Sequence, residues 1–450
     1  MANCSRRDVL AGLALAAQST ANGMADSPER TPAVPSPEAR KKLRDQLLAY
    51  LKPAVPQLLR PATGILKYPS VSPSLPAKTY STSLWDWDTL WTSRGILRFA
   101  ELDKDRDLHQ AACRHIEGSL LNFLDHAAED GRLPIMMNVH DADPFGTLKT
   151  PPTSRNQAKP VFGQLALLLS DQHGDTSWLA PHFDRLLGFY ASWVRGYQSK
   201  AGLLVWGDDV AIGDDNDPAT FGRPFYSSAN LLLNCLYYED LRSAARIAER
   251  LNRPRDAERL SNQARELGER ILDLCWDPRD AFFYSVDVQC VDRRAELIPN
   301  IPRGMDMRWR SLPLKVQMFT GFLPMWCGLA TREQARQMIE ANYRRDRRFR
   351  AAWGVRSLSS YERMYSLDFS SNPSNWLGPV WIIVNYLVWK GLKAYGFDQE
   401  ATELADKTLQ LLCADLAAHG SLNEYYHPDT GAALSHNGFL DWNLLVLEME

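Results

Sequence analysis

A short acidic loop, residues 213–218, contains the residue types that most clearly suggest chemistry. It places Asp214, Asp215 and Asp217 beside the amide of Asn216, between a glycine and a proline. Carboxylates this close raise one another's pKa, so a fold keeps them together mainly where a ligand or a reaction needs them. We therefore take Asp215 as a candidate general acid, a group that must hold its proton near neutral pH. The alternative is an acidic turn that is simply solvated.

A lone carboxylate, Glu424, stands much later in the chain, bracketed by Tyr425 and Tyr426 in a turn-rich segment. Hydrolysis of a glycosidic bond uses two carboxyl groups on one site, one to protonate the departing oxygen and one to act on the opposite face of the sugar. We expect folding to bring Glu424 opposite Asp215, where it would activate a water molecule. Taken alone, a single glutamate in a loop is more often a solvated surface residue.

Tryptophans in polar segments are typical of sugar sites, where an indole face packs on the apolar face of a pyranose ring. The chain has 14 tryptophans, and residues 83–89 alternate them with carboxylates at an expected helix start. The helix dipole also favours acidic residues there, which is the simpler explanation. The residues that we expect to contact substrate are Trp85, Trp87, Asp88, Gln157, Lys159, Trp206, Asn216, Arg223, Trp376, Trp381 and Tyr426. A core position for Trp376 and Trp381, and a solvated helix cap for Gln157 and Lys159, are equally compatible with the pattern.

We expect no metal and no cofactor. The seven cysteines are scattered, with neither a Cys-x-x-Cys motif nor a nearby histidine cluster, which argues against zinc. Read as a calcium loop from Asp208, the third, fifth and twelfth positions are Val210, Ile212 and Ala219, so the ligand spacing fails. The sequence does not identify a disulfide pair.

The start of the chain predicts export. Ser5-Arg6-Arg7 precedes a short apolar run, and small residues follow before Asp26, a pattern typical of a twin-arginine signal peptide over residues 1–25. A proline-rich disordered spacer over 26–35 and one catalytic domain over 36–450 complete the predicted organisation. We therefore expect a periplasmic or secreted protein, the alternative being a cytoplasmic one with a chance Arg-Arg pair. The formal net charge of −3 and dispersed Lys and Arg argue against a nucleic-acid partner, and no segment is apolar enough for an integral membrane helix.

Apolar residues recur at three- and four-residue spacing through most of the chain, which predicts an all-α fold. The predicted helices cover residues 36–52, 85–100, 105–127, 158–170, 176–197, 226–249, 253–275, 314–329, 332–343, 375–395, 398–418 and 437–448. A strand-like run, Ala281–Asp287, predicts a small β-hairpin insertion. Long polar loops after alternate helices favour a closed (α/α)6 toroid with a loop-rich active-site mouth. An open solenoid would show a fixed-length repeat, which is not found.

At these segments the chain resembles glycoside hydrolase family 63, most closely bacterial members related to mannosylglycerate and glucosylglycerate hydrolases, and more distantly the trehalases of family 37. The shared motifs, in order, are Trp85-Asp86-Trp87-Asp88, Gly213-x-Asp215-Asn216-x-Pro218, Phe322-Leu323-Pro324, Trp376-x-Gly378-Pro379-Val380-Trp381 and Glu424-x-Tyr426-x-Pro428-x-x-Gly431. The resemblance implies an (α/α)6 toroid and inversion at the anomeric carbon, with the acid at Asp215 and the base at Glu424. Leu377 stands where many relatives have arginine, Asp214 adds a charge beside the acid, and Arg223 could supply the lost cation.

Together these features predict an inverting α-glycosidase that acts on a small α-glucoside or α-mannoside, such as a mannosylglycerate-like or glucosylglycerate-like compound or a disaccharide. The two carboxyl groups should then be roughly 6.5–9.5 Å apart, to leave room for water. A non-catalytic carbohydrate-binding toroid is one alternative. A sugar isomerase or epimerase is another, since that chemistry uses histidine and His140, His427 and His436 lie near loop segments. The oligomeric state does not follow from the sequence.

Overall fold

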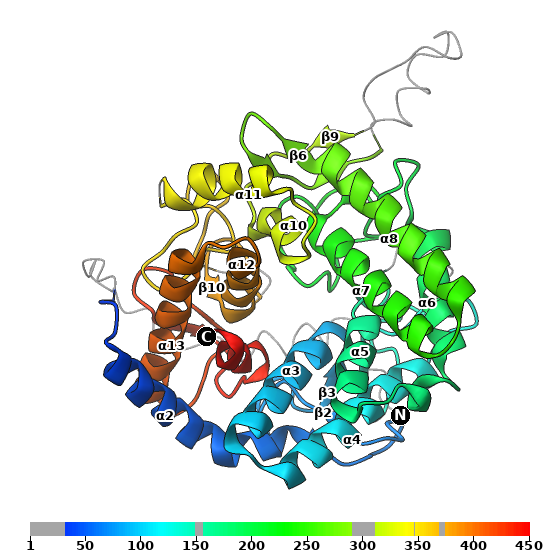
Figure 1. Ribbon diagram of the computed structural model, residues 1–450, viewed down its shortest axis with the longest axis horizontal. Coiled ribbons are helices and arrows are strands. Elements are labelled where there is room, and N and C mark those ends of the chain that lie inside the picture. Colours follow the sequence, from blue (N-terminus) through cyan, green and yellow to red (C-terminus); the bar gives the residue numbers. More distant parts are fainter. Residues whose placement is uncertain (1–31, 149–155, 290–310, 346, 369–373) are drawn as a thin grey trace, which may run out of the picture.

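The helices of the computed structural model form a closed double-layered ring around a central axis (Figure 1). The structure describes residues 32–148, 156–289, 311–345, 347–368 and 374–450. The predicted export signal and the first part of the predicted spacer therefore lie outside the described residues. The fold is the predicted all-α (α/α)6 toroid, accompanied by a few short strand pairs.

The inner layer is a cycle of helices, each packed against the next. It consists of α3 (Asp86–Asp103), α5 (Phe162–His173), α7 (Leu231–Arg250), α10 (Leu323–Trp326), α12 (Ile382–Ala394) and the 3-10 helix η5 (Asp441–Glu448), which packs back on α3. The outer layer is α2 (Pro37–Ala54), α4 (Arg106–Asp125), α6 (Phe183–Tyr197), α8 (Pro254–Cys275), α11 (Arg332–Met338) with its π-helical extension η4 (Ile339–Arg344), and α13 (Asp398–His419). Short 3-10 turns cover Val55–Leu58 (η1), Ser177–Leu179 (η2) and Phe319–Phe322 (η3).

Local sequence sets the helix boundaries. Ser36 caps α2, its hydroxyl accepting the Ala39 N–H at 3.1 Å, with proline at the first helical position as expected. Asn230 caps α7 in the same way, accepting the Leu233 N–H at 3.2 Å. The helix predicted over 375–395 begins only at Ile382, because Gly378 has a φ of 144° and proline follows it. The helix predicted over 314–329 is likewise reduced to η3 and α10.

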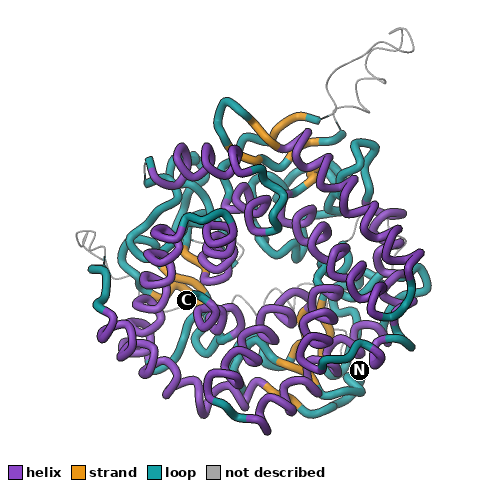
Figure 2. The backbone as a smooth tube through the Cα atoms, in the orientation of Figure 1, coloured by secondary structure: helices purple, strands orange, loops and turns teal. Residues whose placement is uncertain are grey.

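The connections between the layers are markedly unequal in length. Turns from inner to outer helices are short, such as Lys104–Asp105 after α3, 251–253 after α7 and 395–397 after α12. Every inner helix, by contrast, is preceded by a long segment, drawn mainly as teal loop in Figure 2. Because these segments all lead into helix N-termini, they gather at one end of the toroid, where the sequence predicts the active-site mouth.

Neighbouring long loops are joined to each other around this end. β3 (Ser83–Trp85) pairs with β4 (Met136–Asn138), β5 (Ser228–Ala229) with β8 (Val286–Asp287), and β10 (Val380–Trp381) with β11 (Tyr425–Tyr426). Single backbone bridges join Met318 to Leu358 and Ser74 to Phe439. The Asn156 side chain joins the loops before α5 and α7, donating to Asp208 O at 3.1 Å and accepting the Gly207 N–H at 2.8 Å. Each long loop is thus held to both neighbours.

The remaining strands are short. β1 (Leu59–Arg60) pairs with β2 (Ser70–Val71), and β12 (Ala433–Ser435) extends β11. The predicted hairpin over 281–287 divides between two sheets: β7 (Phe282–Phe283) pairs with β6 (Trp276–Asp277), whereas β8 joins β5 and β9 (Leu312–Pro313). This split corrects the expected single arm, since the two residues between β7 and β8 let the chain pass from one sheet to the other.

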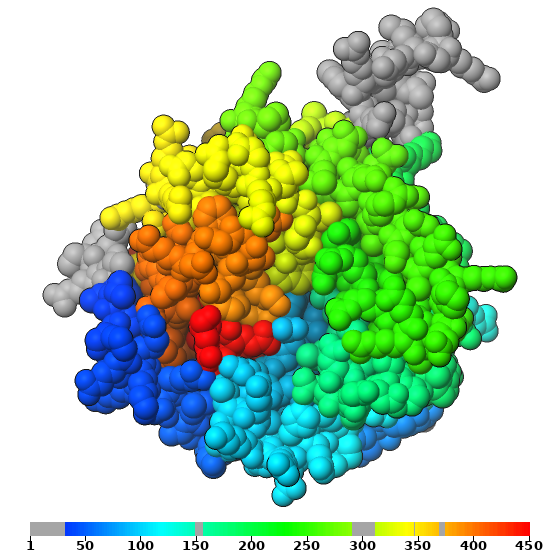
Figure 3. Space-filling view, viewed as in Figure 1, coloured from blue at the N-terminus to red at the C-terminus, as the bar shows by residue number. Residues whose placement is uncertain are grey.

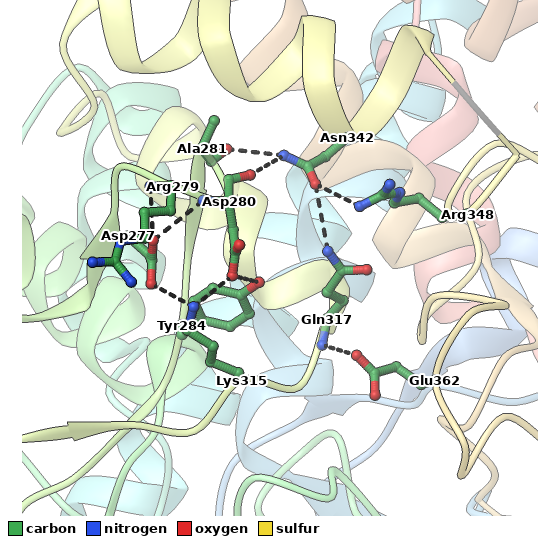
Figure 4. Close-up of polar contacts among 10 residues, drawn as sticks. All are labelled: Asp277, Arg279, Asp280, Ala281, Tyr284, Lys315, Gln317, Asn342, Arg348 and Glu362. Carbon is green, nitrogen blue, oxygen red and sulfur yellow. Dashed lines mark hydrogen bonds and ion pairs between the residues drawn. The ribbon is translucent and has the colours of Figure 1, made fainter.

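Polar side chains anchor this insertion to the ring (Figure 4). Lys315 Nζ bonds to Asp277 at 2.8 Å and to Asp280 at 2.9 Å across the hairpin turn. The buried Asn342 of η4 donates to the carbonyls of Asp280 and Ala281 at 3.1 and 2.9 Å. The hairpin is therefore fixed to η4 by satisfied hydrogen bonds, which costs less than leaving its turn carbonyls unpaired.

The opposite end of the toroid is the face seen in Figure 3, with the C-terminal residues (red) near its middle. There Arg94 donates to Glu448 at 2.8 Å and lines a cavity of about 940 Å³ between α3 and the C-terminal residues. Within the described ranges, no helix combines the length and the apolar character needed to cross a bilayer. The five described cysteines are buried and unpaired; Cys4 and Cys290 lie outside the described residues.

Candidate active site

The acidic loop before α7 buries two of its carboxylates and leaves the third partly exposed. Asp214 and Asp217 are fully buried, and Asp217 accepts the Ala219 N–H at 2.8 Å and the Asn230 side-chain N–H at 2.7 Å. Burial raises the pKa of Asp217 to about 6, and burial with the neighbouring Asp217 charge raises the pKa of Asp214 further above its usual value. The Asp217 side chain thus supports the loop from within, and Asp214 is buried beside it, while Asp215 remains partly exposed.

Asp215 has the protonation behaviour of a general acid. Burial is the main cause that raises its pKa to about 6, and the charge of Glu424 adds to the rise. The Lys159 charge and a hydrogen bond from Ser374 oppose it. An interaction of this kind requires Asp215 and Glu424 to lie near one another, so the fold brings together two carboxylates that the sequence separates widely.

The backbone around Glu424 is held firmly. Its N–H donates to Ser435 O at 3.0 Å and its carbonyl accepts the Trp442 indole N–H at 3.2 Å. The residue is only 3% exposed, and its Oε2 bonds to His436 Nδ1. Desolvation lowers the pKa of His436, but the bond and charge of Glu424 outweigh it, so the pKa lies above its usual value. From the sequence, His436 was a candidate only for the isomerase alternative.

Tyr80 is a member of this group that sequence reasoning missed. Burial raises the pKa of its hydroxyl well above the usual value, and the charges of Glu424, Asp215 and Asp88 raise it further. Its ring meets Trp85 edge-on at 5.8 Å and His436 at 5.3 Å, between ring centroids. Tyr80 also has a φ of 69°, an unusual backbone state for a bulky residue that the surrounding structure must hold in place. The sequence offers no signal for it beyond its position shortly before the Trp85 motif.

Asp86 and Lys159 form a buried ion pair beside Asp215. Lys159 Nζ lies 3.0 Å from Asp86 Oδ1, and the Lys159 backbone N–H donates to Asp86 Oδ2 at 2.6 Å. The lysine, 2% exposed, also donates to Ala211 O at 3.0 Å and lies 5.8 Å from the Trp87 ring centroid. This buried environment differs from the solvated helix cap that the sequence allowed for Lys159. Lys159 acts on the site through its charge.

Asp88 forms a second buried carboxyl pair, with Asp441 at the start of η5. Burial and the Asp86 charge raise the pKa of Asp88 to about 7, and burial and the Asp88 charge raise the pKa of Asp441 well above its usual value. Thr92 Oγ1 donates to Asp441 Oδ1 at 2.7 Å. The charge of Glu424 acts on Asp441 as well, so this pair adjoins the proposed base. In the sequence, Asp441 is a lone aspartate before an apolar run and carries no signal that would select it.

Stacked aromatic rings form a wall behind the carboxylates. Trp381 stacks on Trp376 at 4.0 Å and 6°, and on Tyr425 at 4.4 Å and 29°. Trp87 meets Trp376 at 6.3 Å. Trp376 and Trp381 are buried, at 1% and 0% exposure, so the core alternative describes them better than an open platform. Asn216 links this wall to the acidic loop, since its Oδ1 accepts the Trp376 N–H at 2.7 Å.

Several predicted contact residues lie in supporting positions. The Tyr426 hydroxyl donates to Asp415 at 2.9 Å and is fully buried, and Trp206 packs edge-on against Trp193 at 5.8 Å. Arg223 is ion-paired with Asp287. Gln157 accepts a hydrogen bond from Ser192 at 2.9 Å and is 1% exposed, whereas Trp85 is partly exposed. Among the described residues, His, Cys, Asp and Glu do not gather into a set able to hold a metal.

Comparison with known proteins identifies the family. The model of the mannosylglycerate hydrolase MGH1-like glycoside hydrolase domain matches residues 83–440. The mannosylglycerate hydrolase of Thermus thermophilus is 26% identical over 173 residues, which are 38% of this chain and 34% of that protein. Mannosylglycerate hydrolase MGH1 of Selaginella moellendorffii is 30% identical over 125 residues, 27% of this chain and 22% of that protein. The alignments thus span about a third or less of these relatives.

Solved structures agree in fold. A GH63 mannosylglycerate hydrolase of Thermus thermophilus, crystallised with glucose, superimposes with a TM-score of 0.62 at 19% identity, covering 91% of this chain and 100% of that one. Neutral trehalase Nth1 of Saccharomyces cerevisiae gives 0.54 at 15% identity, covering 85% and 73%. The family 63 resemblance and the more distant trehalase resemblance are both confirmed. This chain belongs to the mannosylglycerate hydrolase MGH1-like glycoside hydrolase family.

Proposed function

We propose that this protein hydrolyses a small α-glycoside with inversion at the anomeric carbon. Asp215 donates a proton to the departing glycosidic oxygen, and Glu424 takes a proton from the water that attacks the opposite face of C1. The bond to the leaving oxygen breaks as the bond from water forms, and the two carboxyl groups end the reaction with their protonation states exchanged. Neither step uses a metal or a cofactor.

The observation that carries the proposal is that Asp215 and Glu424, far apart in the sequence, act on one another in the fold. Asp215 has its pKa raised to about 6 and so holds its proton in mildly acidic solution. Glu424 lies close enough for its charge to add to that rise, and its Oε2 bonds to His436. A carboxyl group of raised pKa that faces a second carboxylate is the arrangement needed for the acid and the base of a glycosidase site.

For the substrate we propose an α-mannoside or α-glucoside with a small aglycone. The support comes from relatives, since the matching family and two curated relatives are mannosylglycerate hydrolases, and one relative was crystallised with Tris and D-glycerate. Two cations that the sequence offered as substrate contacts have protein partners: Lys159 is paired with Asp86, and Arg223 with Asp287. Leu377 replaces the arginine expected from the resemblance. We therefore propose two substrate classes, glycerate conjugates and neutral disaccharides.

A non-catalytic sugar-binding toroid would need the aromatic wall but not a carboxyl group of raised pKa beside a second carboxyl group. An isomerase would need a histidine placed to reach a free sugar, and His436 is instead bonded to Glu424. Both alternatives are weaker on these grounds. For location we propose export through the twin-arginine pathway, on the strength of Ser5-Arg6-Arg7 alone.

The decisive experiment is proton NMR of the first sugar released from a panel of α-glucosides and α-mannosides. We expect the β-anomer to appear first and then to mutarotate. Release of the α-anomer first would contradict inversion, and conversion of free sugar without consumption of a glycoside would support the isomerase. Asp215→Asn and Glu424→Gln should each abolish most turnover while binding of the product sugar stays measurable by calorimetry. Near-normal turnover in either variant would overturn the assignment.

A further inference from the structure

Among the described residues, His436 hydrogen-bonds the side-chain carboxylate of the proposed base, and it comes from the same loop. Glu424 and His436 flank the β11–β12 hairpin that leads into η5, and the His436 side chain is 18% exposed against 5% for Glu424. Its Nδ1 bonds to Glu424 Oε2 and lies 2.8 Å from Ser435 Oγ. The contact uses only one of the two carboxylate oxygens, Oε2.

The backbone that presents this ring is in an unfavourable conformation. His436 has a φ of 39°, and its neighbour across the site, Tyr80, has a φ of 69°. The two rings meet edge-on at 5.3 Å between centroids. Residues in the left-handed region persist only where the surrounding structure fixes them, and such positions gather at functional sites. Two neighbouring residues beside the same carboxylates have this backbone conformation, which indicates a functional position for the His436 ring.

The charges around the pair explain what a cation would do there. Carboxyl groups approach Glu424 from several elements. Asp215, in the loop before α7, and Asp441, in η5, each interact with the charge of Glu424. Asp88, in α3, acts together with Glu424 on the neighbouring Tyr80. A positive charge in contact with Glu424 would offset the repulsion among these carboxyl groups.

The lysines near this site have other partners. Lys159 is bonded to Asp86, and the exposed Lys78 donates to Asn437 at 3.2 Å. His436 is therefore the described cation that touches the base.

We propose that His436, as an imidazolium, is the positioning residue for Glu424: it aims the carboxylate at the attacking water and keeps it ionised within an acidic site. The proposal rests on the assignment of Glu424 as base. In the pH range in which Asp215 holds its proton, the raised pKa of His436 keeps the ring charged, so the two requirements of the reaction coincide.

The first test needs no turnover. The ring of His436 is titrated by NMR in the wild type and in Glu424→Gln. We expect the pKa of His436 to fall when the negative partner is removed, by about one unit or more. An unchanged titration would show that the two groups are not coupled and would overturn the proposal, whether or not the protein proves to be a glycosidase.

The second test separates charge from geometry. His436→Asn keeps a donor at the position of Nδ1 but has no charge, and His436→Ala has neither. We expect the acidic limb of kcat/KM to move to higher pH by about one unit in both variants, because the ionised base is no longer favoured. The asparagine should recover much of the kcat that the alanine loses, with KM little changed in either.

His427 provides a matched control in the same loop. Its Nδ1 accepts the N–H groups of Asp429 and Thr430, both at 3.2 Å, so His427→Asn leaves an acceptor in place. The carboxylate whose charge acts on His427 is Asp429, not the proposed acid or base. The pH profile of kcat/KM for the His427→Asn variant should match that of the wild type. A purely structural role for His436 would lower activity without moving the acidic limb, and that result would overturn the proposal. Absence of any turnover in the wild type would instead refute the proposed function, while the NMR titration would still decide whether the pair is coupled.

Discussion

Replacing Asp215 with asparagine should remove general acid catalysis and have no other effect of comparable magnitude. The two side chains have nearly the same shape, but the amide cannot give a proton to the departing oxygen. General acid catalysis is worth about 10²–10⁴-fold. For a glycoside with a poor leaving group, such as a methyl glycoside, we expect kcat/KM to fall within that range. An α-glycosyl fluoride needs no proton to depart, so its hydrolysis should fall far less.

The pH dependence gives a second measure of the same step. With a pKa of about 6, Asp215 is about nine-tenths protonated at pH 5 and about one-tenth at pH 7, so wild-type kcat/KM should fall about tenfold per pH unit above the pKa. In Asp215→Asn this alkaline limb should disappear with the fluoride substrate. Initial rates over pH 4–8 for both substrates are the assay. An alkaline limb that persists in the variant, or equal losses on both substrates, would refute the role of Asp215.

Three further changes test the surroundings of the site. Lys159→Met should raise the pKa of Asp215 and so move the alkaline limb of the kcat/KM profile to higher pH; a shift of that limb to lower pH would contradict this. The same change leaves Asp86 unpaired, which should lower the free energy of unfolding by about 3–5 kcal/mol. Trp381→Ala should cost about 3–5 kcal/mol in urea unfolding, because its ring is fully buried, and a loss below about 1 kcal/mol would place the ring outside the core. Burial raises the pKa of Asp240 from 3.8 to about 7, so its share of stability is present at low pH and lost as pH rises to 7, at up to about 1.4 kcal/mol per unit. Asp240→Asn should flatten the fall in melting temperature over that range, and an unchanged slope would exclude Asp240 as a source.

The sequence was most informative where one force dominates. Helix positions followed from apolar periodicity, because each helix buries one face within a double layer. The prediction failed where local backbone chemistry overrides that periodicity. Residues 375–381 have helical spacing of apolar side chains, yet Gly378 and Pro379 keep them extended until Ile382. The hairpin over 281–287 was predicted as a unit, but pairing with distant strands divided it.

The site was predictable in part for a similar reason. Asp215 stood out because clustered charges are costly, and Glu424 because of its aromatic setting, whereas Tyr80 and Asp441 stand beside no such signal. Their importance arises from neighbours that are distant in sequence. Burial likewise cannot be read from residue type: Trp85 is partly exposed, whereas Trp376, in an equally polar segment, lies 1% exposed behind the carboxylates. Roles that depend on which atoms meet need the three-dimensional arrangement.

The bridge between Ser74 and Phe439, together with the packing of η5 on α3, affects the order in which the protein folds. The ring closes only when the segment that carries Phe439 and η5 returns to the segment that carries Ser74 and α3, and contacts between segments so far apart in sequence form slowly. Glu424, His436 and Asp441 all belong to the segment that returns. A folding intermediate can therefore have most of its helices and still lack part of the candidate site, so we expect catalytic activity to appear only once this closing contact has formed.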